Sequence, residues 1–373
     1  MSEVEMIRVD GAAIKAQCEA ILVGWGMDAE TATVTAEVLL DCDLRGIDTH
    51  GISLLALYAG WIRGDGFSLA AKPEIERDGP SYGLINAHGG LGFAVSVQAV
   101  EMAVKKARAT GIAAVGVRNS HHFGAAGYYA RLAGRAGLVG LVATSTKVVC
   151  LVPPGASKPV LGTNPLAYAV PRKDAEPIVF DMATSTAAGN KVRMHHLKSL
   201  PVPEGWVVDG QGQPVTDPHE AYKLVYEPGE GGLTPLGASP HLGSHKGYGL
   251  ALLVHFLGGA LTGGTFAGSV NGREGKPEGD NIGHFFIAID PEVFRGVDAF
   301  LADVEDVSET LKSTPSVDPN RPVMLPGDLE ERVRGERLKD GVPLAPALVK
   351  QLSAIADELG VPFQLIDKNA AVN

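Results

Sequence analysis

A histidine in a short polar turn is the first feature that could do chemistry. The stretch RGIDTHGISLL, residues 45–55, places His50 after Asp48 and Thr49 and before Gly51. An imidazole titrates near neutral pH and therefore suits proton transfer to or from a substrate hydroxyl. We expect a helix to begin near Thr49, so that the helix dipole lowers the pKa of His50 while Asp48 raises it, leaving it near neutrality. The alternative is that His50 only hydrogen-bonds the turn.

Two further stretches combine polar side chains with glycine or with the end of an expected strand. In NSHHFGAAGYY, Gly124 and Gly127 would let a ligand approach the free N–H groups at the start of a helix. Tight helix packing on small residues explains the same pattern equally well. In LGTNPLAYAVP, Thr163 and Asn164 offer a hydroxyl and an amide, or form a simple turn.

Charged side chains lie at the end of one expected strand and at the start of one expected helix. Asp181 follows the apolar run 178–180, so it stands at a strand end, either in a ligand site or as a turn residue. His245 and Lys246 precede a glycine-rich apolar helix, where a cation opposes the dipole unless an anion is bound or the lysine lies over apolar surface. His241 and His245 are four residues apart but lack the glutamate of a zinc-protease motif, so we predict no metal site.

The elements that must position these residues follow from the periodicity of apolar residues. A first helix is expected between a cap at Asp28 and a stop at Gly46. A second is expected over 94–109, and a buried one over 248–261. Residues 195–245 are expected to be mostly loop. Strands are expected at 82–88, 111–117, 137–146, 166–171, 177–185 and 283–290. Because strands and helices do not alternate strictly, the fold class is α/β or α+β with a mixed sheet.

The glycine fingerprint of a Rossmann nucleotide-binding domain is absent. The nearest match is HGGLGFAV, residues 88–95, in which Val95 stands where the third glycine belongs. We interpret Gly90 and Gly92 as a strand-to-helix turn. If the protein uses a dinucleotide, it does so on another fold.

Composition limits the class of protein. A chain of 373 residues has room for about two domains. Its net charge of −11 disfavours nucleic acid and anionic membranes as partners. Cys18, Cys42 and Cys150 form no disulfide framework, and the first residues lack a signal-peptide pattern, so we expect a cytoplasmic protein. The most apolar stretch, residues 250–266, is shorter than the ~20 residues that cross a bilayer.

Taken together, these stretches resemble the malate/L-lactate dehydrogenase family of the second, non-Rossmann type. This family also includes L-sulfolactate, ureidoglycolate and 2,3-diketogulonate dehydrogenases and piperideine-2-carboxylate reductase. The matching stretches occur in the family's order and span nearly the whole chain. They are RGIDTHG, NSHHFGAAGYYA, LGTNPLAYAVP, DMATS with Lys191 after it, GWVVDGQGQPVTDP, PLG, HKGYGLALLV, GGALTGG, GHFFIAID and PGD.

The resemblance implies an NAD- or NADP-dependent oxidoreductase that transfers hydride to or from C2 of a small 2-hydroxy or 2-oxo acid. The alternatives are a reductase of a cyclic imino acid and, in a different class, a metal-dependent lyase or hydrolase. The resemblance also implies a homodimer with a small carboxylate substrate. Three parts are implied: an N-terminal helical segment (1–78), a cofactor-binding sheet domain (79–305) and a C-terminal helical segment (306–373) packed on the first.

Site residues are implied position by position. His50 matches the family's proton-transfer residue, and Thr49 matches a position that supports it. Lys191 matches a lysine near the histidine and is expected, with Thr49, to set its orientation and pKa. Thr163 matches a substrate contact. The cofactor-binding positions are His122, Phe123, Gly124, Ala125, Ala126, Asp181, Met182, Ala183, Lys246, Gly247, Pro326 and Gly327.

One departure concerns the substrate carboxylate. Many members carry an arginine four residues after the histidine, and this chain has Leu54 there. Leucine cannot make a charge-assisted clamp. Either another cation replaces it, with Arg45, Arg63, Lys191 and Arg193 as candidates, or the substrate differs. A binding protein without activity on the same scaffold is the remaining alternative.

Overall fold

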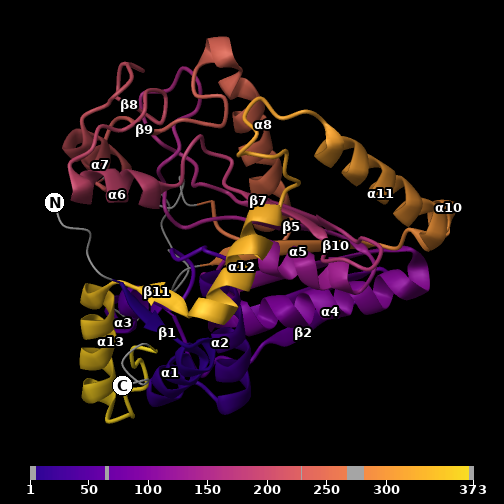
Figure 1. Cartoon of the computed structure of the whole chain (residues 1–373), viewed down its shortest axis with the longest axis horizontal. Helices are drawn as coiled ribbons and strands as arrows, with labels where there is room; N and C mark the ends of the chain where they lie inside the picture. The colour runs from indigo at the N-terminus through magenta and orange to yellow at the C-terminus, as the bar shows by residue number, and fades with distance from the viewer. Residues whose placement is uncertain (1–5, 64–66, 228, 267–280, 369–373) are drawn as a thin grey trace.

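A seven-stranded mixed sheet forms the centre of the computed structural model, which describes residues 6–63, 67–227, 229–266 and 281–368 (Figure 1). The spatial order of the strands is β2–β3–β4–β10–β5–β6–β7, and only β3 and β4 run parallel. This confirms the expected mixed sheet. The strand bounds are β2 Glu74–Asp78, β3 Tyr82–Gly90, β4 Ile112–Ser120, β5 Val139–Thr144, β6 Leu166–Val170, β7 Ile178–Met182 and β10 Ile282–Ile289.

Helices cover both faces of this sheet. Gly283 and His284 are neighbours in β10, so their side-chain positions lie on opposite faces. His284 stacks on Phe123, on the face covered by α4 (Gly92–Thr110) and α5 (Ala126–Arg135). A Cβ on Gly283 would lie 1.9 Å from the Gly258 oxygen, so on the other face glycine permits close contact with the helix that contains Gly258.

That second helix is only half buried, which corrects the expectation of a buried helix over 248–261. It consists of α8 (Ser244–His255) and a π-helical continuation (Phe256–Ala260). Leu253 is 47% exposed and Phe256 is 56% exposed, on the side away from the sheet. An apolar sequence therefore predicted the helix correctly but not its burial.

Segments from the two ends of the chain pack together below the sheet in Figure 1. Strand β1 (Ile7–Val9) pairs antiparallel with β11 (Val342–Leu344). Helices α1 (Gly11–Gly24) and α3 (Ser53–Arg63) both contact α13 (Pro346–Leu359). The division at residues 78 and 305 stays a prediction, and residue 305 lies inside α11 (Val297–Ser313), which follows the short α10 (Glu292–Arg295).

A second, smaller hydrophobic core occupies the region that we expected to be mostly loop. Helices α6 (Gly189–Lys198) and α7 (Pro218–Tyr226) pack there beside the short strands β8 (Val207–Val208) and β9 (Gly232–Leu233). A single-turn 3-10 helix, η1 (Pro240–Leu242), leads into α8. Buried side chains of this core include Val192, Val207 and Val225. Because its strands have two residues each, their periodicity is too short to read from sequence.

The turn that carries His50 lies between two helices. Asp28 caps α2 (Ala29–Leu44) as predicted, accepting from the Thr31 N–H at 3.0 Å. The next helix begins at Ser53 and not near Thr49, so His50 lies outside it. The Ile52 N–H donates to the buried Asp43 carboxylate at 2.7 Å, which holds the preceding residues in a turn.

The glycines of the HGGLGFAV stretch serve packing, as expected for a strand-to-helix turn. A Cβ on Gly92 would lie 2.6 Å from the Phe123 Cβ. Gly92 therefore allows the start of α4 to lie against the segment before α5.

None of the helices within the described residues is both long and apolar enough to span a bilayer.

Candidate active site

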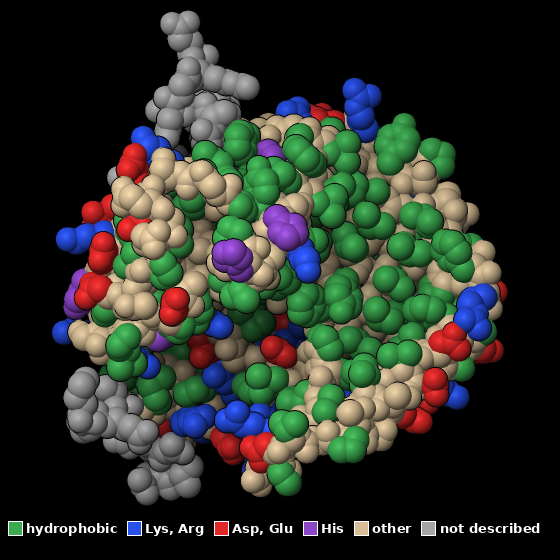
Figure 2. Space-filling view, turned by 90° about the horizontal axis from the view of Figure 1, so that it is seen from above, with side chains coloured by type: hydrophobic (Ala, Val, Ile, Leu, Met, Phe, Trp, Pro, Cys, Tyr) green, Lys and Arg blue, Asp and Glu red, His purple; other side chains and the backbone are tan. Residues whose placement is uncertain are grey.

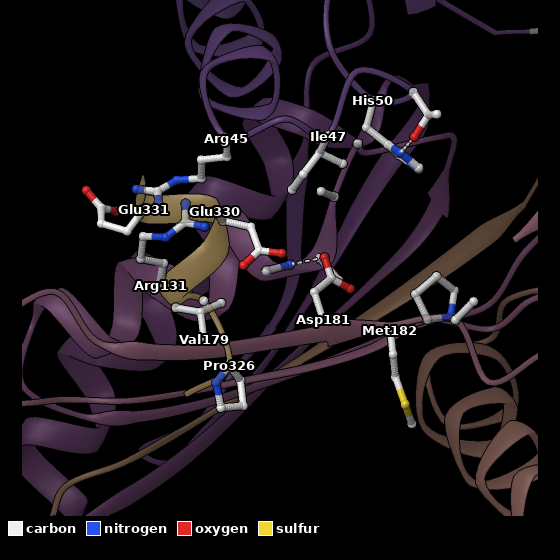
Figure 3. A pocket seen from close by; sticks show the side chains of 18 of the residues that line it. Arg45, Ile47, His50, Arg131, Val179, Asp181, Met182, Pro326, Glu330 and Glu331 are labelled. Carbon is white, nitrogen blue, oxygen red and sulfur yellow. Dashed lines mark hydrogen bonds and ion pairs between the residues drawn. The ribbon is translucent and has the colours of Figure 1, made fainter. Parts of the chain in front are cut away.

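A cavity of about 670 Å³ lies where several elements converge, within the size range of small-molecule sites (Figure 3). Its walls come from the turn after α2, the start of α5, the end of β7, the start of α6 and the start of α12 (Asp328–Asp340). Segments distant in sequence therefore build one site. Most of the predicted site residues line it: Arg45, Thr49, His50, Gly124, Ala125, Ala126, Thr163, Asp181, Met182, Ala183, Lys191, Pro326 and Gly327.

His50 lies at one end of the cavity in contact with two other polar groups. Its Nδ1 is 2.7 Å from the Thr49 hydroxyl oxygen. The ring stacks on His122, with centroids 5.7 Å apart. His122 in turn has its Nδ1 2.7 Å from the Tyr58 hydroxyl. The orientation of the imidazole is thus set by a hydroxyl on one side and a stacked ring on the other.

Burial decides the charge of His50. Desolvation lowers the pKa of His50 to about 4, so the imidazole is neutral at neutral pH. The expected pKa near neutrality is wrong because Asp48 does not act on His50. The Asp48 carboxylate forms an ion pair with Arg337 of α12 instead.

The turn that carries His50 is held by contacts with Asp43 of α2 and with Arg337 of α12. A Cβ on Gly51 would lie 1.8 Å from the Asp43 carboxylate oxygen, so only glycine fits there. Burial raises the pKa of Asp43 to about 8. From outside, Arg337 donates to the Asp43 carbonyl at 2.5 Å and to the Asp48 carboxylate. These contacts join the last turn of α2, the His50 turn and α12.

Three helices begin at the cavity without a cap from their own N-cap residue, although the Asp181 carboxylate accepts from the Gly127 N–H in the first turn of α5. They are α5, α6 and α12, whose N-cap residues Ala125, Ala188 and Gly327 make no side-chain cap hydrogen bond. Free N–H groups and aligned peptide dipoles at such ends attract anions. The residues therefore fit the pyrophosphate of a dinucleotide cofactor.

The start of α12 is attached to the edge strand of the sheet. The Val179 N–H of β7 donates to the Pro326 carbonyl at 3.2 Å. Gly327 follows with φ +93°, and a Cβ there would lie 3.2 Å from the Val179 backbone. Glycine is required here for a left-handed conformation at close approach.

A carboxylate occupies the first turn of α5. The Gly127 N–H donates to Asp181 at 2.7 Å. Desolvation within the cavity raises the pKa of Asp181 to about 6, and the carboxylate of Glu330 acts in the same direction. Figure 3 shows the Glu330 side chain directed toward the region of Asp181. Carboxylates of this kind suit hydroxyl donors such as those of a ribose.

Three of the four cations that line the cavity are already paired. Arg45 binds Asp41 at 3.0 Å and Glu331 at 2.6 Å, and Arg131 also binds Asp41, at 2.7 Å. Arg172 binds Glu305 at 2.7 Å. The fourth, Lys191, forms no ion pair within the described part of the chain, and its Nζ lies 5.9 Å from the centre of the Trp206 ring.

Five predicted residues do not line the cavity. The buried Asn164 amide donates to the Ala251 carbonyl at 2.9 Å, and Phe123 packs in the core. His122 does not line the cavity itself but stacks on His50, which does. Lys246 is exposed, and Gly247 packs against the backbone of Leu236. The expected anion site at the start of α8 therefore lies away from this cavity.

The remaining candidates from the sequence also fall outside the cavity. Arg193 does not line it, and the side chain of Arg63 lies outside the described residues. His241 and His245 are both exposed, and the described residues contain no group of three metal-ligand side chains.

Sequence reasoning missed Arg131, Glu330 and Glu331. Arg131 lies four residues after Gly127, so both share one face of α5, a spacing that could have found it. Glu330 and Glu331 lie in the first turn of α12, behind a Pro-Gly pair that the sequence did single out.

Comparison with known proteins gives the family. The model of the malate/L-lactate dehydrogenase family matches residues 9–353. A malate dehydrogenase of Pyrococcus horikoshii is 36% identical over 91% of this chain and 92% of the relative. A (2R)-3-sulfolactate dehydrogenase (NADP(+)) of Chromohalobacter salexigens is 34% identical over 90% of this chain and 94% of the relative.

Solved structures agree with these matches. Malate dehydrogenase of Entamoeba histolytica superposes with a TM-score of 0.90 at 31% identity, covering 96% of this chain and 99% of that one. The delta1-piperideine-2-carboxylate reductase of Pseudomonas syringae superposes with a TM-score of 0.80 at 29% identity, covering 94% and 99%.

These matches extend over nearly the full length of both partners in each comparison. The protein is an NAD(P)-dependent oxidoreductase of hydroxy acids. On the evidence of the family match and these near-complete alignments, the chain belongs to the malate/L-lactate dehydrogenase family.

Proposed function

We propose that the protein interconverts a small 2-hydroxy acid and its 2-oxo acid, with His50 as the group that moves the proton. The observation that carries this proposal is a neutral, oriented imidazole at the wall of the cavity. A nicotinamide cofactor held in this cavity would supply the redox chemistry, as acceptor or donor of the hydride at the substrate C2. The protein then has to hold the substrate and manage one proton.

The contact with Thr49 prepares His50 for this role. When His50 Nδ1–H donates to the Thr49 oxygen, the lone pair of Nε2 remains free to accept the substrate hydroxyl proton. In the reverse direction, Nε2–H returns the proton to the oxygen at C2. The stacked His122 is itself neutral because burial lowers its pKa, so it adds no competing charge.

The residues around the three helix N-termini would hold the cofactor. The segments Gly124–Ala126, Asp181–Ala183 and Pro326–Gly327 all line the cavity. Uncapped N–H groups of α12 would bind phosphate oxygens. Asp181, which already accepts from the Gly127 N–H at the start of α5, would face hydroxyl groups together with Glu330. The structural likeness to a piperideine-2-carboxylate reductase favours one second candidate, reduction of a cyclic imino acid, in which His50 would deliver the proton to nitrogen.

A His50→Asn variant tests the proposal. Turnover should fall by ~10²–10⁴-fold, because a general acid-base group contributes that much, while cofactor binding stays within about twofold. Turnover is measured by nicotinamide absorbance on 2-hydroxy acids, 2-oxo acids and cyclic imino acids with both cofactors. Binding is measured by titration of cofactor fluorescence.

His88→Asn is the matched control, because His88 is exposed and lies outside the cavity. It should leave turnover unchanged. Near-normal turnover of His50→Asn would contradict the proposal, and the preferred substrate of the wild type separates hydroxy acid from imino acid chemistry.

We also propose that the protein acts as a cytoplasmic homodimer. The three cysteines are buried free thiols, as expected in a reducing compartment. An apolar stripe on α8 and its π-helical continuation supports self-association, since Leu253 and Phe256 are exposed at helical spacing.

A further inference from the structure

The carboxylate of the substrate needs a cation, and the structure narrows the choice. The substrate class of the proposed function carries a carboxylate on C1, next to the reacting carbon. Leu54, four residues after His50, is 6% exposed and packs in the core, so it contributes nothing to the cavity. A buried carboxylate without a charged partner would bind poorly.

The arginines of the cavity are committed to protein carboxylates. Arg45 and Arg131 share Asp41, and Arg45 also binds Glu331. In Figure 3 both guanidinium groups lie toward Glu330 and Glu331, on the side of the cavity away from His50. Recruiting either one for a substrate would break a largely buried ion pair, which is costly.

Lys191 is in the opposite situation. It lies in the first turn of α6, where the helix dipole disfavours a cation unless an anion is close. It has no carboxylate partner within the described residues, and its ammonium group lies over the Trp206 ring, 5.9 Å from the ring centre. The neighbouring Val192 is fully buried in the second core, so this turn of α6 is firmly held.

Thr163 supplies a second polar group in the same cavity. Its side-chain hydroxyl makes no hydrogen bond with any residue that the structure describes, and its backbone carbonyl accepts from Thr184. A hydroxyl and an ammonium together can bind one carboxylate through two donors.

From these observations, and resting on the proposed function, we propose that Lys191, assisted by Thr163, binds the C1 carboxylate of the substrate and determines the preference for 2-hydroxy and 2-oxo acids over uncharged analogues. This differs from a role in tuning His50, since no contact joins the two side chains and the ring partner of His50 is Thr49.

The test compares an acid with its neutral amide. Pyruvate and pyruvamide are assayed as a pair, with Lys191→Met, Lys191→Arg and wild type as holoenzymes. Loss of a charged contact to substrate should lower kcat/KM for pyruvate by ~30–1,000-fold in Lys191→Met, mostly through KM. The value for pyruvamide should change by less than about threefold, and Lys191→Arg should recover most of the activity on pyruvate.

Lys198→Met is the matched control, because Lys198 ends the same helix and does not line the cavity. Two further readouts exclude other roles: KM for the cofactor and the acid limb of the pH profile should both stay as in wild type. An equal loss for pyruvate and pyruvamide, or a loss confined to cofactor KM, would overturn the inference.

Binding of oxamate to the cofactor-loaded protein, measured by calorimetry, keeps the inference independent of turnover. Lys191→Met should weaken oxamate binding by a factor similar to its effect on pyruvate. His50→Asn should affect turnover far more than oxamate binding. Unchanged oxamate affinity in Lys191→Met overturns the role of Lys191, whereas normal turnover in His50→Asn overturns the proposed function.

Discussion

At the scale of single residues, the proposed chemistry depends on a neutral imidazole. His50 has Thr49 at Nδ1 and the neutral His122 against its face, while Asp48 is engaged by Arg337. No described carboxylate makes contact with the His50 ring, so nothing offsets the desolvation that lowers its pKa to about 4. A substrate carboxylate bound beside His50 would supply that missing charge and raise the pKa of His50 in the complex.

The pH profile of oxidation follows from this. In the proposed mechanism oxidation needs neutral His50, so kcat/KM for a hydroxy acid should be retained above the pKa of the free histidine and lost as pH falls through it. We expect this acid limb near pH 4, well below the 6.5 of an unperturbed histidine, while the limb of kcat lies higher. A pH-jump assay from pH 7 avoids acid unfolding before the measurement.

Asp181 is the titrating group to control on the acid side, whereas Asp43, with a pKa raised to about 8, acts only above neutral pH. Its pKa is raised to about 6, so its titration could produce a separate limb. Asp181→Asn removes that limb and leaves the one due to His50. A limb near pH 6.5 that persists in Asp181→Asn would contradict the assignment of a strongly lowered pKa to His50.

At the scale of elements, α12 holds the turn that carries His50. Arg337 donates to the Asp43 carbonyl and the Asp48 carboxylate, and Glu331, nearly two turns earlier, binds Arg45. The same helix presents Pro326 and Gly327 to the cavity at its start. One helix from the C-terminal part of the chain therefore connects the His50 turn to the proposed cofactor-binding wall.

We predict that Arg337→Met lowers kcat more than it lowers stability. The ion pair with Asp48 is partly exposed and contributes only about 0–1 kcal/mol to folding. A small displacement of His50, however, can reduce turnover by roughly 10-fold or more. Steady-state kinetics and thermal unfolding measure the two effects, with Arg337→Lys expected to recover part of kcat.

Arg332→Met on the same helix is the control, because Arg332 only contacts Glu336 at 4.0 Å on the surface. It should change neither quantity. If Arg337→Met lost stability and activity in proportion, or lost neither, the positioning role of α12 would be refuted.

At the scale of the whole molecule, an apolar surface remains uncovered. Figure 2 shows hydrophobic side chains spread over a broad part of one face. Leu253 and Phe256 of α8 and its continuation are about half exposed, and Leu261 just beyond is 64% exposed. Apolar surface area of this kind is typical of a protein interface.

We predict that replacing Leu253 and Phe256 together by glutamate shifts a homodimer toward monomer, because two buried charges would oppose association. Sedimentation velocity over a concentration series measures the change. Val23→Glu is the control, since Val23 is 47% exposed on α1, at the opposite end of the molecule from α8 (Figure 1). A monomeric wild type, or a dimer unaffected by both glutamates, would contradict this prediction.

The sequence alone determined what depends on local pattern. The cap at Asp28, the strand-to-helix turn at Gly92 and the main strands of the sheet follow from residues that act on their neighbours. Ordered motifs along the chain likewise identified the family, and most of the site residues that they predicted line the cavity. These features are readable because propensity, capping and spacing are properties of short segments.

Only the tertiary structure decided which of these residues are available for chemistry. The pKa of His50 depends on burial by distant segments. The Asp48 carboxylate is paired with Arg337, 289 positions later in the chain, and therefore does not act on His50. Arg45 and Lys191 are both cations in sequence, yet Arg45 is paired with Glu331, whereas Lys191 has no carboxylate partner among the residues that the structure describes. Charge, burial and pairing arise between elements that meet only after folding, because electrostatic and solvation energies depend on distance in space and not along the chain.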